Sequence, residues 1–164
     1  MDNTFLHEVA ITAIIIKDGK YLITKRSPNK KRFPGMWTVP GGRLEASDYQ
    51  ALPKDTKFYW YNVLERVLVR EVKEEAGITI KNVEYLTSLA TVHKDGSPSI
   101  VVSCIADYDG GGVVLQKEEA DDYKWVTTEE AKEYPLIDGI FEEFVQIDEW
   151  KKTGTKPLWR RAAR

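Results

Sequence analysis

The chain has 164 residues, 42% hydrophobic and 11% aromatic, which is enough to bury one sizeable core and favours a single domain over residues 1–164. A formal net charge of −2 gives no overall basic field and argues against a stable complex with nucleic acid. No signal peptide is recognisable and no apolar run reaches the roughly 20 residues of a membrane helix, so we expect a cytoplasmic protein without membrane contact. The single cysteine, Cys104, excludes an internal disulfide and is expected to be a packed core thiol.

Two strands joined by a hairpin turn are predicted at the start of the chain. Residues 8–17 form an Ile- and Val-rich run that is too short for most helices, which predicts a strand buried on both faces. Asp18-Gly19 predicts the turn, and residues 20–26 are expected to return as the partner strand. The basic loop that follows, residues 29–32, is either solvated or positioned to steer a polyphosphate.

A helix is predicted over residues 63–76. Asn62 and Glu65 would form a capping box at its start, and Gly77 would end it in the left-handed conformation. The stripe of this helix that should face the protein body is apolar in the first turns and acidic in the last two. Charge that simply faces solvent would lie elsewhere on the helix.

Three carboxylates share that acidic face. At about 100° per residue, Glu74 and Glu75 lie roughly 60° and 40° on either side of Glu71. Like charges repel there and the helix C-terminus disfavours anions, so a cation is expected to offset them. Clustered hard oxygen ligands suit Mg²⁺ or Mn²⁺, which usually bridge a few carboxylates to substrate phosphates. The alternative interpretation is a solvated acidic helix end.

Strands and an acid-rich loop are predicted after the helix. The residues from 78 onward begin a strand, the pattern continues to residue 92, and a β-branched run over residues 99–108 predicts another strand. The loop before the next strand carries four acids between residues 118 and 122. A solvated acidic loop and a contribution to a metal or catalytic site are both compatible with that pattern.

The chain is expected to end in helices. Thr127 or Thr128 is the predicted N-cap of a short helix, and residues 136–150 predict a final amphipathic helix. The inner face of that final helix is expected to carry Ile140, Phe144 and Ile147. The basic segment over residues 153–164 is compatible with a mobile tail.

These features resemble the signature of the Nudix hydrolases: a Gly, five residues, a Glu, seven residues, then Arg-Glu-apolar-x-Glu-Glu-x-Gly-apolar. Residues 70–78 match the second half at every specified position. Residues 33–45 resemble the first half and its Pro-Gly-x-Trp-x-x-Pro lead-in, with Asp48 where the signature has its first Glu. Between Gly42 and Arg70 lie 27 residues, 14 more than the 13 of the signature, so we expect an insertion over residues 49–61.

The resemblance implies an α/β fold, the Nudix α/β/α sandwich with a mixed β-sheet flanked by helices, and the alternation of strands and helices favours the same layers. It implies Mg²⁺ as cofactor, with Mn²⁺ as a substitute. The implied metal ligands are the Gly41 carbonyl and the carboxylates of Glu71, Glu74 and Glu75. The implied catalytic set is Glu74, Arg70 and Asp122. Arg70 would orient the carboxylates, while the general base is Glu74 or an acid among residues 118–122, where Glu118, Glu119 and Asp121 rival Asp122.

Two further residues are candidates for substrate binding. Arg26 occupies the place where many members of the resembled family keep an arginine beside substrate phosphate, and a guanidinium suits bidentate phosphate binding. Trp60 belongs to four consecutive aromatic residues in the expected insertion. Such rings stack on a base, cover the core or pack between subunits, so a homodimer contact stays open.

Together these features predict hydrolysis of a phosphoanhydride bond in a nucleoside diphosphate derivative, with Mg²⁺. The compact domain and the Pro-Gly-Met-Trp lead-in favour a nucleoside triphosphate pyrophosphohydrolase. The alternatives are a sugar-nucleotide or dinucleoside polyphosphate hydrolase and a noncatalytic nucleotide-binding Nudix module, for which Asp48 and the insertion are the only hints.

Overall fold

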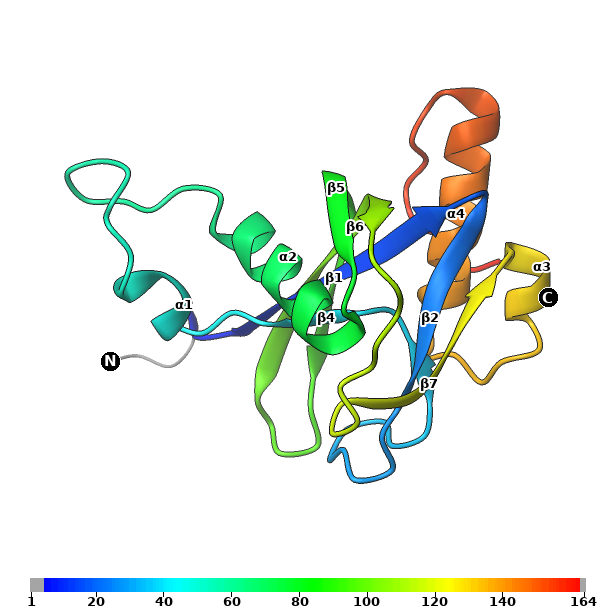
Figure 1. Ribbon diagram of the computed structural model, residues 1–164, viewed down its shortest axis with the longest axis horizontal. Coiled ribbons are helices and arrows are strands. Elements are labelled where there is room, and N and C mark those ends of the chain that lie inside the picture. Colours follow the sequence, from blue (N-terminus) through cyan, green and yellow to red (C-terminus); the bar gives the residue numbers. More distant parts are fainter. Residues whose placement is uncertain (1–4, 163–164) are drawn as a thin grey trace.

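The computed structural model describes residues 5–162 and confirms an α/β fold in which helices flank a mixed sheet (Figure 1). The helices are α1 (Ser47–Gln50), α2 (Val63–Ala76), α3 (Thr128–Ala131) and α4 (Ile140–Thr153). The strands are β1 (Glu8–Lys17), β2 (Lys20–Arg26), β3 (Trp37–Thr38), β4 (Gly41–Arg43), β5 (Thr79–Val92), β6 (Pro98–Gly110) and β7 (Ala120–Val126). Within the described residues, no helix is both long and apolar enough to cross a lipid bilayer.

The sheet splits between β1 and β2. These strands pair antiparallel only beside their turn, at Ile16 with Tyr21 and Lys17 with Lys20. Farther along, β2 pairs instead with β3, while β1 pairs with β4, and β7 borders the other edge of β2. The segment that carries β3 and β4 therefore crosses the gap between the two separating strands. Strand β6 runs parallel to β1 and joins it to the antiparallel edge strand β5.

Alternate side chains of the central strands enter two different cores. On β1, Ala13 and Ile15 pack on the α2 side, whereas Ile14 packs on the α4 side. The predicted inner face of α4 is confirmed, because Phe144 and Ile147 are almost fully buried. Period-2 alternation with apolar residues on both faces is what a strand covered by helices on both sides requires.

Helix α2 has the predicted bounds, but its predicted start motif is wrong. Asn62 has φ 53° and its side chain makes no capping hydrogen bond. An N-capping side chain normally requires β-region backbone, so this left-handed conformation precludes the capping box with Glu65. The C-terminal prediction is confirmed: Gly77 has φ 73°, and its N–H donates to the carbonyl of Lys73 over 3.0 Å.

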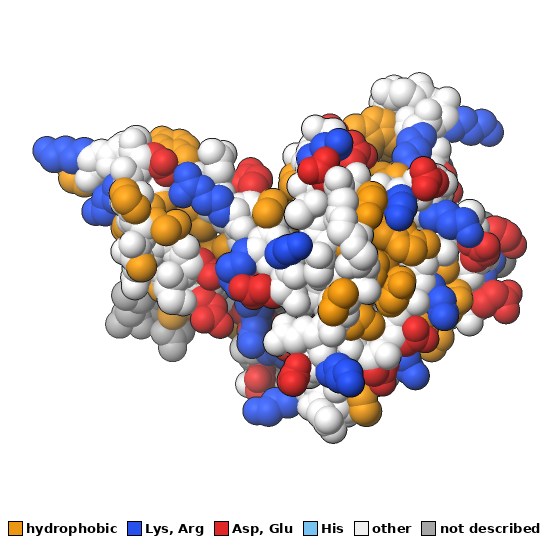
Figure 2. All heavy atoms as spheres, in the orientation of Figure 1, with side chains coloured by type: hydrophobic (Ala, Val, Ile, Leu, Met, Phe, Trp, Pro, Cys, Tyr) orange, Lys and Arg blue, Asp and Glu red, His pale blue; other side chains and the backbone are white. Residues whose placement is uncertain are grey.

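Residues 51–61, which make up most of the insertion expected over residues 49–61, form a lobe that projects from the rest of the molecule (Figures 1 and 2). Its chain folds on itself: the backbone N–H groups of Asp55 and Thr56 both donate to the carbonyl of Tyr59. The Trp60 indole N–H donates to the Leu52 carbonyl over 2.9 Å. More than half of the surface of Phe58, Tyr59 and Tyr61 is exposed, so these aromatic residues do not cover the core.

The end of the chain differs from its prediction. Helix α4 begins after Gly139, which has φ 96°, and continues to Thr153, so the expected start at residue 136 is wrong. Residues 154–162 return along α4, where the Gln146 side-chain amide donates to the Pro157 carbonyl over 2.7 Å. The Trp159 indole N–H donates to the Gly139 carbonyl over 3.3 Å. This part of the predicted mobile tail is therefore docked, and residues 163–164 lie outside the described residues.

A buried acid on α4 gives a pH-dependent stability prediction. Glu143 is 3% exposed and accepts a hydrogen bond from the Ser103 hydroxyl over 2.6 Å. Burial raises its pKa from 4.5 to about 7, although the Ser103 hydrogen bond opposes the shift. The folded protein therefore holds a proton between pH 4.5 and 7 that the unfolded chain releases, so the free energy of unfolding falls as the pH rises through this window.

We expect Glu143→Gln to remove the part of that pH dependence that Glu143 contributes, since the amide keeps the shape but does not titrate. The free energy of unfolding of the parent protein should fall between pH 5 and pH 8 by roughly 2 kcal/mol more than that of the variant. Urea denaturation at the two pH values measures both quantities. Equal pH dependence in parent and variant would show that Glu143 is not the group responsible.

Candidate active site

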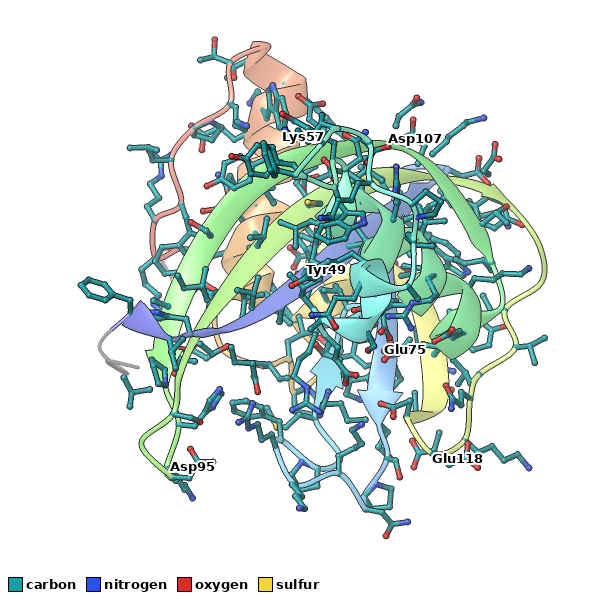
Figure 3. The ribbon with its side chains drawn as sticks, turned by 90° about the vertical axis from the view of Figure 1, so that its left-hand side faces the viewer. Tyr49, Lys57, Glu75, Asp95, Asp107 and Glu118 are labelled. Atoms are coloured by element: carbon teal, nitrogen blue, oxygen red, sulfur yellow. The ribbon has the colours of Figure 1, made fainter. Side chains whose placement is uncertain are left out.

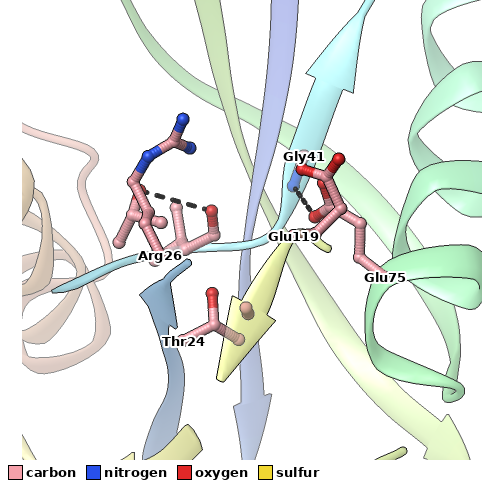
Figure 4. Close-up of a pocket in the computed structure, with 8 residues that line it drawn as sticks. Thr24, Arg26, Gly41, Glu75 and Glu119 are labelled. Carbon is pink, nitrogen blue, oxygen red and sulfur yellow. Dashed lines mark hydrogen bonds between the residues drawn. The ribbon is translucent and has the colours of Figure 1, made fainter. Parts of the chain in front are cut away.

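A small polar pocket lies where the sheet splits (Figure 4). It is lined by Thr24, Arg26, Thr38, Val39, Gly41, Glu75, Glu119 and Ala120. These residues come from β2, the β3–β4 segment, α2 and the start of β7. In Figure 4, Glu75 and Glu119 lie together beside Gly41, and Arg26 lies on the opposite side. The pocket therefore sets a guanidinium across from two carboxylates.

Glu75 is held at the pocket by the backbone of the β3–β4 segment. The Gly41 N–H donates to Glu75 Oε2 over 3.2 Å, an interaction drawn in Figure 4. Burial raises the pKa of Glu75 to about 7, with a further rise from the charge of Glu119 and an opposing effect from the Gly41 hydrogen bond. A cation that enters the pocket would therefore stabilise the charged form of this carboxylate.

Glu71 lies against the neighbouring glycine. A Cβ atom added to Gly42 would lie 2.2 Å from the Glu71 Cδ, so only glycine permits this approach. Burial raises the pKa of Glu71, the charge of Glu74 raises it further, and Arg70 works against the shift. Glu71 and Glu75 of the acidic face of α2 thus lie against Gly42 and Gly41 of strand β4, as the helix geometry predicted, whereas Glu74 is exposed to solvent.

Arg70 connects the acids of the signature. Its Nη2 atom lies 2.7 Å from Asp48 Oδ1 and 2.9 Å from Glu71 Oε1, and its Nη1 atom lies 2.9 Å from Glu74 Oε2. Glu74 is the most exposed of these acids, with 52% of its side chain accessible. Asp48 also accepts from the Glu45 N–H, so this acid of α1 is held by the backbone before it as well as by Arg70 of α2.

Arg26 enters the pocket as a partly desolvated cation. Burial lowers the pKa of its guanidinium, while the charges of Glu75 and Glu119 raise it. Its Nε–H donates to the carbonyl of Arg32 over 2.9 Å, which orients the guanidinium. The structure thus brings Arg26 together with the predicted residues Glu75 and Gly41.

Asp122 does not reach this pocket. Its carboxylate accepts from the Tyr123 N–H over 2.8 Å and lies 3.8 Å from Lys124 Nζ, with about half of the side chain in solvent. Among the rival acids, Glu119 lines the pocket and is paired with Lys30. The physical reason is position: Glu119 precedes β7, beside the splitting sheet, whereas Asp122 lies within β7, paired with Lys25.

Trp60 does not reach the pocket either. Its ring packs on Tyr49, with ring centroids 5.2 Å apart, and Lys54 Nζ lies 5.0 Å from its ring centroid. The described contacts of the Trp60 side chain are thus with helix α1 and with the lobe itself. In Figure 3, Lys57 of the same lobe and Glu75 are well apart, which places the tip of the insertion away from the pocket.

The oxygen donors present fit a divalent cation of the Mg²⁺ type. Among residues 5–162, no three acidic or histidine side chains form a ready-made metal cluster. Mg²⁺ does not require one, because it retains waters and usually takes one or two carboxylates together with substrate phosphates. Burial and neighbouring negative charges raise the pKa values of Glu71 and Glu75. A bound cation would offset both effects most strongly at these two carboxylates.

Comparison with known proteins shows the family. The model of the NUDIX domain matches residues 6–145, so the chain belongs to the Nudix family of hydrolases, as the signature implied. A CTP pyrophosphohydrolase of Escherichia coli is 30% identical over 126 residues, covering 77% of this chain and 80% of that relative. A NAD-capped RNA hydrolase of Chromobacterium violaceum is 30% identical over 112 residues, covering 68% of this chain but only 35% of that protein.

Solved structures agree on the fold. The MutT Nudix hydrolase of Burkholderia pseudomallei has a TM-score of 0.69 against this chain at 21% identity. The similarity covers 87% of this chain and 98% of that structure. It therefore confirms the Nudix sandwich that the sequence predicted.

Proposed function

We propose that the protein hydrolyses a phosphoanhydride bond of a nucleoside diphosphate derivative in a Mg²⁺-dependent reaction. The observation that carries the proposal is the pocket in which Arg26 faces Glu75 and Glu119, with the acid pair Glu71 and Glu74 held alongside by Arg70. Phosphoryl chemistry requires neutralisation of the substrate charge together with precise positioning. A guanidinium and hard-oxygen donors on facing walls of one pocket supply both.

A nucleoside triphosphate is the favoured substrate, with release of pyrophosphate. The relative named for CTP pyrophosphohydrolase is matched over most of both chains, whereas the NAD-capped RNA hydrolase contains a large part that this chain does not match. Sugar nucleotides and dinucleoside polyphosphates remain the alternatives. The ion pair between Asp48 and Arg70 weakens the case for a noncatalytic module, because the shorter acid still contacts the arginine of the signature.

The residues of the site have different proposed tasks, and Glu74 is a candidate for two of them. Bound Mg²⁺ would supply charge neutralisation and a more acidic water, with Glu71, Glu74, Glu75 and the Gly41 carbonyl as its ligands. Arg26 would bind a phosphate through its guanidinium. Arg70 would act as a positioning residue that spaces the acids. Glu119 or Glu74 would accept the proton of the attacking water, with Glu119 replacing Asp122 as the candidate from its loop.

The test is product analysis on a panel of nucleoside triphosphates, sugar nucleotides and dinucleoside polyphosphates, with Mg²⁺ or with EDTA. We expect a nucleoside monophosphate and pyrophosphate from at least one triphosphate, and no turnover after metal removal. Ion-exchange chromatography separates these products from orthophosphate and the nucleoside diphosphate. Undiminished turnover in EDTA, or no turnover of any compound with Mg²⁺, would reject the proposal.

A further inference from the structure

The basic loop after β2 is fastened to the acidic loop before β7. The Ser27 N–H donates to the Glu119 carbonyl over 2.9 Å, and the Lys30 N–H donates to the Ser27 carbonyl over 3.1 Å. Ser27 is 3% exposed, so this junction is buried. The backbone of both loops therefore holds Lys30 close to Glu119.

Lys30 also contacts Glu119 through its side chain. The Lys30 ammonium donates to Glu119 Oε2, and only 28% and 31% of the two side chains are accessible. Glu119 is one of the two carboxylates in the pocket. The ammonium thus pairs with the carboxylate that would otherwise be available to bind a cation or to accept a hydrogen bond from an attacking water.

The three basic residues of this loop have different environments. Arg32 is paired with Glu8, with Nη1 and Oε1 2.7 Å apart. Lys31 is exposed and has no ion pair among residues 5–162. Only Lys30 pairs with an acid of the pocket. A lysine is suited to changing partners, because its ammonium is a point charge on a flexible stem and partly exposed pairs contribute little net stability.

We infer that Lys30 is an exchangeable cation of the site. In the free protein its ammonium neutralises Glu119; when substrate binds, Lys30 moves to the phosphates and leaves the Glu119 carboxylate free to face the pocket. This inference rests on the proposed function, since it assigns a phosphate and a cation to the same pocket. It gives Lys30 opposite effects on two ligands: the lysine competes with a metal cation and assists a phosphate.

Two titrations without turnover test it, one with Mn²⁺ alone followed by electron paramagnetic resonance of the free ion, the other with inorganic pyrophosphate alone followed by calorimetry. For Lys30→Ala we expect Mn²⁺ to bind about threefold more tightly. We expect pyrophosphate to bind about tenfold more weakly. Lys31→Ala is the matched control, expected to change neither affinity beyond about twofold. Lys30→Arg should restore pyrophosphate binding, because it keeps the charge.

The outcomes are distinguishable. Opposite shifts in Lys30→Ala with little change in Lys31→Ala support the inference. Shifts in the same direction, a shift in only one titration, or equal behaviour of the two alanine variants overturn it while the proposed function stands. A parent protein that binds neither Mn²⁺ nor pyrophosphate rejects the proposed function and this inference with it.

Discussion

Glu75→Gln is expected to lower kcat at least about a hundredfold while the protein stays folded. The amide keeps the size of the side chain and an oxygen that can still accept from the Gly41 N–H. It removes the negative charge from a partly buried position that faces Arg26 across the pocket. The charge is what attracts a divalent cation. Steady-state kinetics over a range of Mg²⁺ concentrations should therefore show that the variant needs more Mg²⁺ for half-maximal activity, in addition to a lower kcat.

Other glutamates of α2 provide the comparison. Glu74→Gln should have a smaller effect, about tenfold to a hundredfold, since half of that side chain is in solvent. Glu65→Gln, an exposed acid ten residues before Glu75 on the same helix, should leave kcat and KM unchanged. If Glu75→Gln matched Glu65→Gln in activity, Glu75 would have no part in catalysis.

Gly42→Ala is the second substitution with a large expected effect. The new Cβ would meet the Glu71 Cδ at 2.2 Å and the Glu71 Cγ at 2.5 Å. Both atoms belong to a flexible side chain that can turn away, so the fold should survive with a displaced carboxylate. We expect activity to fall at least about a hundredfold because misplacing one reacting group by about 1 Å has effects of that size.

The preceding glycine is the matched comparison with the opposite expectation. A Cβ on Gly41 would lie 2.3 Å from the Ile11 carbonyl oxygen and 2.7 Å from the Thr12 Cα, both backbone atoms of β1. Gly41→Ala should therefore lower the melting temperature, whereas Gly42→Ala should keep it within a few degrees of the parent. Thermal denaturation and the pyrophosphate assay on both variants measure the two effects. A folded, fully active Gly42→Ala protein would contradict the placement of Glu71.

Much of the fold is predictable because local chemistry determines it. The bounds of β1, β2 and α2 follow from β-branched runs, an Asp-Gly turn and a glycine helix end, all of which the structure confirms. The Thr127 N-cap, with Glu130 completing its capping box, is one of the two alternatives that the sequence left open. The burial of Cys104 follows from its apolar surroundings and is confirmed.

Other features depend on distant contacts that no local pattern specifies. The ion pair of Lys30 with Glu119 joins the loop after β2 to the loop before β7, which are far apart in the sequence. For the same reason the sequence pattern indicates several acids between residues 118 and 122 but not which of them lines the pocket. The prediction named Asp122, whereas the pocket contains Glu119. The position of Trp60 could not be predicted because no local pattern indicates its contacts with Tyr49 of α1 and the Leu52 carbonyl.

The measurement that tests the central claim most directly is a crystal structure with Mg²⁺ and a nonhydrolysable nucleoside triphosphate analogue. We predict Mg²⁺ about 2.1 Å from carboxylate oxygens of the α2 acids Glu71, Glu74 and Glu75, together with phosphate oxygens and waters. The Arg26 guanidinium should contact a phosphate of the same analogue. An analogue bound elsewhere, with these acids carrying no ion and still paired only with Arg70, would contradict the account.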